Sequence, residues 1–64
     1  MRNTEALHLL NELYDEVYMM YQTSNVEWNE AFEKDSYKDM REVSCKRGAY
    51  MDVLNLLVDK MREM

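Results

Sequence analysis

The sequence predicts an all-α protein built as a helical hairpin. Its 64 residues include no proline and a single glycine, so few residues would interrupt a helix or favour a tight turn. An all-β fold needs turn signals about every 8–12 residues, and the sequence lacks them. The third observation is an apolar heptad that lies on one stripe of a helix. Its members are Leu7, Leu10, Tyr14, Val17 and Tyr21.

The first helix is expected from about Thr4 to Gln22. Asn3 or Thr4 can cap its start, and Glu5 in the first turn interacts favourably with the helix dipole. The apolar stripe is wider than the seam of a simple two-stranded coiled coil, because further apolar residues flank it on both sides. These are Ala6, Leu13, Met20 and Tyr18. Such a width is typical of a helix that touches at least two neighbours in a bundle.

A turn is expected at residues 23–25, where three polar side chains interrupt the apolar pattern. Ser24 followed by Glu27 has the spacing of a capping box, in which the two residues satisfy each other's backbone N–H groups. This signature predicts a new helix from about residue 25.

The second helical region is expected to extend from about residue 25 to residue 63, with a possible break near 35–36 or 48. Ser36 followed by Asp39 offers a second cap, which favours a kink or restart there. At Gly48 the apolar spacing continues in register, which favours a continuous helix over a helix end. A straight helix of this length would reach about 58 Å, roughly twice the first helix. The mismatch favours a kink or a partner chain that covers the overhang.

A chain of 64 residues forms at most a single domain, 1–64, with a small core. Such a domain buries only about 60% of the surface that its unfolded chain exposes, and its core rarely supplies more than roughly 3–5 kcal/mol. One cysteine cannot form an internal disulfide, and one cysteine with one histidine cannot build a structural zinc site. Self-association is the remaining way to stabilise so small a domain, so we expect a homodimer in which two hairpins form a helical bundle.

The candidate interface consists of apolar side chains that one neighbouring helix cannot cover. In the apolar segment 53–58, Leu56 and Val58 each point about 100° away from Leu57. Aromatic and methionine side chains elsewhere are suited to adaptable interfaces. The candidate interface residues are Tyr18, Met19, Trp28, Phe32, Leu56 and Val58. Alternatively, these side chains fill the core of a small bundle.

Charge is unevenly distributed along the chain. Residues 1–33 hold seven acidic residues and one basic residue, a net −6, whereas residues 34–64 hold six acidic and seven basic residues, a net +1. The acidic half argues against direct nucleic-acid binding. The acidic half could bind a basic surface on a partner. If its acidic side chains form one exposed ridge, it could instead mimic a phosphate backbone. The alternative is that these side chains form a solvated face that aids solubility. The candidate acidic face is Glu12, Asp15, Glu16, Glu27, Glu30 and Glu33.

No set of residues in the sequence carries catalytic chemistry. His8, the sole histidine, lies just outside the apolar stripe, and no residue pattern supplies it with a nucleophile or an orienting partner. The sequence contains no Gly-rich phosphate loop and no metal-ligand spacing. We therefore expect a protein that is not an enzyme and that uses no cofactor and no metal.

The sequence shows no secretory signal, and no stretch approaches the 18 or so consecutive apolar residues of a membrane span. Its unpaired cysteine fits a reducing compartment, so the cytoplasm is the expected location. In size, acidity, Met and Tyr content and lack of chemistry, the chain resembles the short accessory proteins that bacteriophages make to bind and disable host machinery. The resemblance involves no motif. The excess apolar and aromatic side chains, the acidic half and the absence of catalytic groups predict an acidic protein-binding module that occupies a surface on a larger partner, and the resemblance implies an inhibitor of a host protein. A homo-oligomeric scaffold or adaptor and a nucleic-acid mimic are the alternatives.

Overall fold

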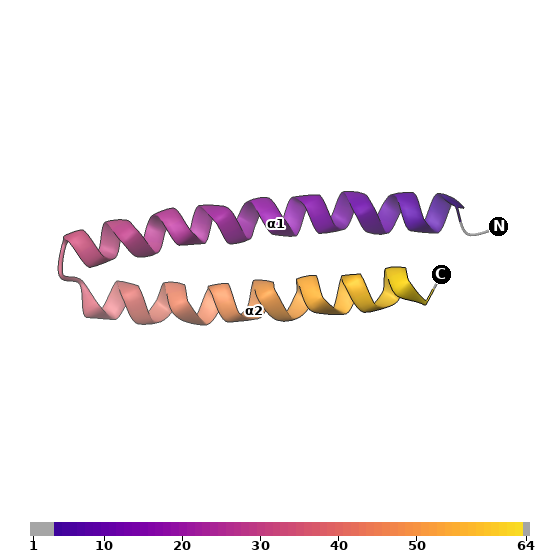
Figure 1. Cartoon of the computed structure of the whole chain (residues 1–64). Coiled ribbons are helices and arrows are strands. Elements are labelled where there is room, and N and C mark those ends of the chain that lie inside the picture. Colours follow the sequence, from indigo (N-terminus) through magenta and orange to yellow (C-terminus); the bar gives the residue numbers. More distant parts are fainter. Residues whose placement is uncertain (1–3, 64) are drawn as a thin grey trace.

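The chain folds into two antiparallel helices joined by a short turn, which confirms the all-α hairpin. The computed structural model describes residues 4–63, with α1 at Thr4–Glu33 and α2 at Tyr37–Arg62. The helices lie side by side along their length, so that the start of α1 and the end of α2 are at the same end of the molecule (Figure 1). The hairpin is elongated, with principal extents of 51 × 14 × 10 Å. Asn3, one of the two expected caps, lies outside the described residues.

The turn expected at residues 23–25 is wrong, because α1 continues through these residues. Ser24 does not cap a helix. Its hydroxyl donates a hydrogen bond to the backbone carbonyl of Tyr21, with a distance of 2.6 Å between the oxygens, which satisfies a serine inside a helix. Ser24 is only 1% exposed, so it lies at the contact between the helices, where packing outweighs its local preference for a cap.

The actual turn, at residues 34–36, is a Schellman motif. The N–H of Ser36 donates to the carbonyl of Ala31 at 2.9 Å, and the N–H of Asp35 donates to the carbonyl of Phe32 at 3.1 Å. Asp35 is left-handed, with φ of 56°, a conformation that aspartate tolerates better than most residues. The Ser36 hydroxyl then caps α2 by accepting from the N–H of Asp39 at 3.4 Å. The restart expected near 35–36 is confirmed.

Replacing Asp35 with glycine should raise the free energy of unfolding by about 0.5–1 kcal/mol, because glycine adopts positive φ without a Cβ clash. The measurement is urea unfolding followed by far-UV circular dichroism at one fixed protein concentration. Asp35→Val is the matched opposite change and should lower stability. A lower midpoint for the glycine variant would contradict the left-handed turn.

Each helix contributes one heptad stripe to the contact between them, and together these stripes form the seam. In α1 the seam residues are Leu10, Tyr14, Val17, Tyr21, Ser24, Trp28 and Ala31. In α2 they are Met40, Val43, Arg47, Tyr50, Leu54, Leu57 and Met61. All are buried or half-buried, and both sets step by four and three, as in an antiparallel coiled coil. The heptad recognised in the first third of the sequence therefore continues in phase to Ala31.

The helix lengths remove one argument for a partner chain. The two helices contain 30 and 26 residues, so neither extends far beyond the other. Trp28 and Phe32, which were expected in the second helical region, lie in α1. The helix continues through Gly48 as favoured, and a Cβ built there meets nothing within 4 Å. No close approach of helices at Gly48 occurs within the hairpin.

Few apolar side chains are fully covered, because each helix has only one neighbour. Among residues 4–63 the buried apolar residues are Ala31, Val43 and Leu54, whereas Leu57 is half-buried. The accessible surface is 5078 Å², which exceeds by roughly 700 Å² the value expected for a compact monomer of this size. Large apolar side chains remain exposed in both helices: Leu7, Leu9, Leu13, Tyr18, Met19, Met20, Val26, Phe32, Tyr37, Met51, Val53 and Leu56.

Candidate protein-binding faces

Two long sides of the hairpin flank the seam. In an antiparallel coiled coil the e positions of both helices share one side and the g positions share the other. The e positions form what we call the aromatic face: Asn11, Tyr18, Asn25, Phe32, Tyr37, Ser44, Met51 and Val58. The g positions form what we call the mixed face: Ala6, Leu13, Met20, Glu27, Asp39, Lys46, Val53 and Lys60. One cross-helix contact marks each side. The Trp28 Nε1–H donates to the Ser44 hydroxyl at 3.1 Å, and Lys46 Nζ lies 3.2 Å from Glu27 Oε1.

The aromatic face carries no charged residue at any of its eight positions. Tyr18 stacks between Tyr14 and Tyr21, with ring centroids 6.1 and 6.4 Å apart, and Trp28 stacks on Phe32 at 5.6 Å. These separations lie in the favourable range for aromatic pairs. The stacked rings hold one another in place and present a row of apolar surface along α1.

A hollow of about 280 Å³ opens on the aromatic face, lined by Tyr21, Ser44, Arg47, Gly48 and Met51. The guanidinium of Arg47 lies over the Tyr21 ring, 6.0 Å from its centroid. The Nε atom of Arg47 is buried and has no hydrogen-bond partner within the hairpin. A buried N–H group without an acceptor is energetically costly, so Arg47 keeps one unmet hydrogen-bond donor beneath this face.

The mixed face combines apolar and charged side chains. Its hollow of about 320 Å³ is lined by Met19, Met20, Thr23, Glu27, Lys46 and Tyr50. The Lys46–Glu27 ion pair is about half exposed and so adds at most about 1 kcal/mol to stability. Exposed Leu13, Met20 and Val53 lie at the other apolar positions. An apolar centre beside charged groups is the composition of many non-obligate interfaces.

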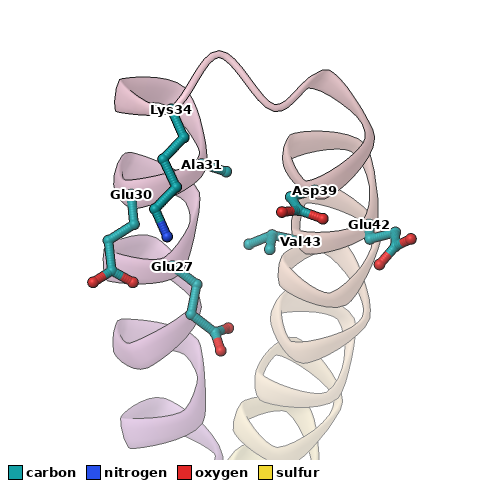
Figure 2. Close-up of a pocket in the computed structure, with 7 residues that line it drawn as sticks. All are labelled: Glu27, Glu30, Ala31, Lys34, Asp39, Glu42 and Val43. Carbon is teal, nitrogen blue, oxygen red and sulfur yellow. The ribbon is translucent and has the colours of Figure 1, made fainter.

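A third hollow, of about 230 Å³, lies beside the turn (Figure 2). Its lining is Glu27, Glu30, Ala31, Lys34, Asp39, Glu42 and Val43. The Lys34 side chain extends between Glu27 and Glu30, while Glu42 points away from α1 (Figure 2). No group of three His, Cys, Asp or Glu side chains within residues 4–63 is placed to hold a metal ion.

The structure brings together four of the six candidate interface residues. Tyr18, Phe32 and Val58 lie on the aromatic face, and Trp28 borders it from the seam. Met19 lines the hollow of the mixed face, and Leu56 is exposed outside the aromatic face. Sequence reasoning missed Tyr37 and Met51, both of which are exposed on the aromatic face. Both residues belong to α2, so their place on this face follows only from the position of the turn at residues 34–36.

The candidate acidic residues do not form one ridge. Glu12, Asp15 and Glu16 form one group, and Glu27, Glu30 and Glu33 form another near the turn. Residues 17–26 between them carry no charge and span about 15 Å of helix. Glu12 lies 3.0 Å from His8 Nε2, and Glu27 is paired with Lys46. The continuous ridge that nucleic-acid mimicry requires is not formed by these side chains.

The two helices carry opposite net charges. Helix α1 holds seven acidic residues and no Lys or Arg, a net −7 with His8 neutral, whereas α2 holds six basic and four acidic residues, a net +2. The division of charge seen in the sequence coincides with the turn. Each helix is therefore electrostatically complementary to the other.

Within residues 4–63, neither helix combines the length and apolar character needed to cross a membrane. The aromatic and mixed faces are the features from which a function can be inferred. Comparisons with protein-family models, with curated proteins and with solved structures found no match for this chain.

Proposed function

We propose that this chain is a small protein-binding module that acts by occupying a surface on a larger partner. The observation that carries the proposal is the imbalance between core and surface within residues 4–63. Three apolar residues are buried, whereas twelve large apolar side chains are exposed. So small a core makes a lone hairpin marginally stable. A partner that covers the exposed side chains stabilises the folded chain by binding it in preference to the unfolded chain.

The mixed face is the surface best suited to a separately folded partner. Leu13, Met20 and Val53 supply its apolar contact area, and the Glu27–Lys46 pair supplies polar contacts beside them. The net −7 of α1 favours a partner with a basic surface, because complementary charge accelerates association and excludes acidic competitors.

Occupancy alone is sufficient for this module to act. A protein that covers a surface inhibits a partner whose own ligand binds there, as the resemblance to phage accessory proteins implies. The exposed, unpaired Cys45 is compatible with a reducing compartment, so we propose that the protein acts in the cytoplasm.

Affinity capture from a lysate with quantitative mass spectrometry tests this proposal. Met20→Lys places a charge at the centre of the mixed face and should reduce the retained partner at least tenfold. Val26→Lys is the matched control, because Val26 is an exposed apolar residue of α1 outside both faces. Retention by the wild type and by Val26→Lys, with loss from Met20→Lys, is the expected pattern. Recovery of no protein above background at micromolar bait would contradict it.

A homo-oligomeric scaffold or adaptor is the second candidate function. The uncharged aromatic face and the opposite charges of the two helices favour it. Such a protein sediments as one defined oligomer, and its melting temperature rises with protein concentration.

A further inference from the structure

We infer that a second copy of this chain covers the aromatic face. The two copies form a two-fold dimer in which α1 of each packs antiparallel against α2 of the other, with both turns at the same end. This arrangement rests on the self-association put forward as the second candidate function. It assigns that association to one face and leaves the mixed face free for a larger partner.

The exposed area matches what a dimer requires. The hairpin exposes 5078 Å², a surplus of roughly 700 Å² over a compact monomer of its size. A standard stable interface buries about 800 Å² on each partner. Covering one long side of the hairpin therefore brings the protein close to the surface of an ordinary globular chain.

The aromatic face has the composition of a permanently covered surface. Burying it covers the guanidinium of Arg47, which already lies over the Tyr21 ring, but no charged group at its eight positions, so the ionic desolvation cost is confined to one residue. Obligate interfaces are more apolar than transient ones, and interfaces in general are rich in aromatic residues and methionine. The mixed face would bury Glu27, Asp39, Lys46 and Lys60 instead. A second copy therefore fits the aromatic face better.

Charge selects one of the two possible two-fold arrangements. If the turns lay at opposite ends, α1 would pack on α1 of the partner subunit and bring net charges of −7 and −7 together. If the turns lie at the same end, α1 packs on α2 of the partner subunit, and −7 meets +2. Like charges across an interface are costly. Both arrangements keep every neighbouring pair of helices antiparallel, as in a four-helix bundle, so charge decides between them.

In the same-end dimer, a residue of one copy has the same position along the long axis of the bundle as the same residue of the other copy. The Trp28–Ser44 and Glu27–Lys46 contacts show which residues of α1 and α2 lie at the same position along this axis. Tyr18 then lies between the partner subunit's Met51 and the partner subunit's Val58, and the sulfur of the methionine can contact the ring edge favourably. The partner subunit's Asn25 comes level with the hollow that Tyr21, Arg47 and Met51 line, so a small polar side chain faces this hollow.

Sedimentation equilibrium of matched variants tests the choice of face. Tyr18 and Met20 lie on opposite sides of α1 and are 42% and 48% exposed. Tyr18→Lys should raise the dimer dissociation constant at least 100-fold, whereas Met20→Lys should change it less than threefold. Loss of helicity together with loss of the dimer in Tyr18→Lys also supports the inference, because Met20→Lys carries the same charge and remains a helical dimer. A monomeric wild type, or the reverse pattern, would overturn it.

Spin–spin distances test the arrangement. Lys38 is exposed near the turn, and Lys38→Cys in a Cys45→Ser background carries one nitroxide per chain. Turns at the same end place the two labels within roughly 30 Å, because packed helices lie about 8–10 Å apart. Turns at opposite ends separate the labels by a distance approaching the 51 Å length of the hairpin. The short distance supports the same-end dimer, and the long distance overturns it.

The dimer and the partner-binding proposal can fail separately. A wild type that is monomeric but still captures a protein through the mixed face overturns the dimer alone. A same-end dimer whose captured proteins are unaffected by Met20→Lys retains the dimer and contradicts the mixed-face proposal.

Discussion

Leu54→Ala should lower the free energy of unfolding by about 2–5 kcal/mol, the usual cost of emptying a buried leucine site. Leu54 is 4% exposed and is one of three buried apolar residues within residues 4–63. A core of this size supplies only a few kcal/mol in total, so most of the variant should be unfolded at 25 °C. Urea unfolding followed by circular dichroism at fixed protein concentration measures the change.

Leu56→Ala is the matched control for this prediction. Leu56 has the same side chain, lies in the same helix and is 56% exposed, so its truncation should cost about 0.5 kcal/mol or less. Two residues apart on a helix point about 200° apart. Equal losses from Leu54→Ala and Leu56→Ala would therefore mean that α2 presents a different stripe to α1.

Trp28→Ala should lower the free energy of unfolding by about 2–4 kcal/mol, somewhat less than for a fully buried tryptophan. The half-buried ring stacks on Phe32 at 5.6 Å, and its Nε1–H forms the hydrogen bond to Ser44 across the helices. Truncation removes both contacts and opens the seam near the turn. Thermal unfolding followed by circular dichroism checks the change, since Trp28 is the sole tryptophan and its fluorescence is lost in the variant.

The hydrogen bond of Trp28 can be separated from the packing of its ring. Trp28→Phe keeps an aromatic ring but removes the donor, and Ser44→Ala removes the acceptor. Each should cost about 0.5–1.5 kcal/mol. The double variant should cost less than the sum of the two, because both remove the same interaction. Fully additive losses would show that the bond adds nothing to stability.

The hairpin could be predicted from the sequence, but the position of its turn could not. Thr23, Ser24 and Asn25 resemble a helix boundary because each favours caps and turns when it is solvated. Ser24 is instead turned into the seam and bonded to the carbonyl of Tyr21, so its preference for a cap has no effect. The actual turn contains no glycine, and only the Ser36–Asp39 spacing indicated it. The left-handed Asp35 gives no stronger sequence signal, because aspartate is common in many other conformations.

The candidate faces were only partly predictable, for a related reason. The charge difference between the two halves of the chain can be counted directly from the sequence, and the boundary between residues 33 and 34 used for that count coincides with the end of α1. Membership of a face depends on helical phase. Placing Trp28 and Phe32 in a second helix separated them from Tyr18, although one uninterrupted heptad places all three on one side. Exposed Tyr37 and Met51 become part of that side only when the turn is known.

The crowding of specific contacts near the turn has a consequence for how the chain folds. The Trp28–Ser44 and Glu27–Lys46 contacts join residues only 16 and 19 positions apart, so the loops that they close cost little chain entropy. Leu10 and Met61, at the far end of the seam, must close a much longer loop. We therefore expect folding to begin at the turn and to extend toward the chain ends one heptad at a time, with the fast kinetics of a protein of low contact order. Native-state hydrogen exchange should follow the same gradient, slowest for amides beside Ala31 and Val43 and fastest near the free ends of the helices.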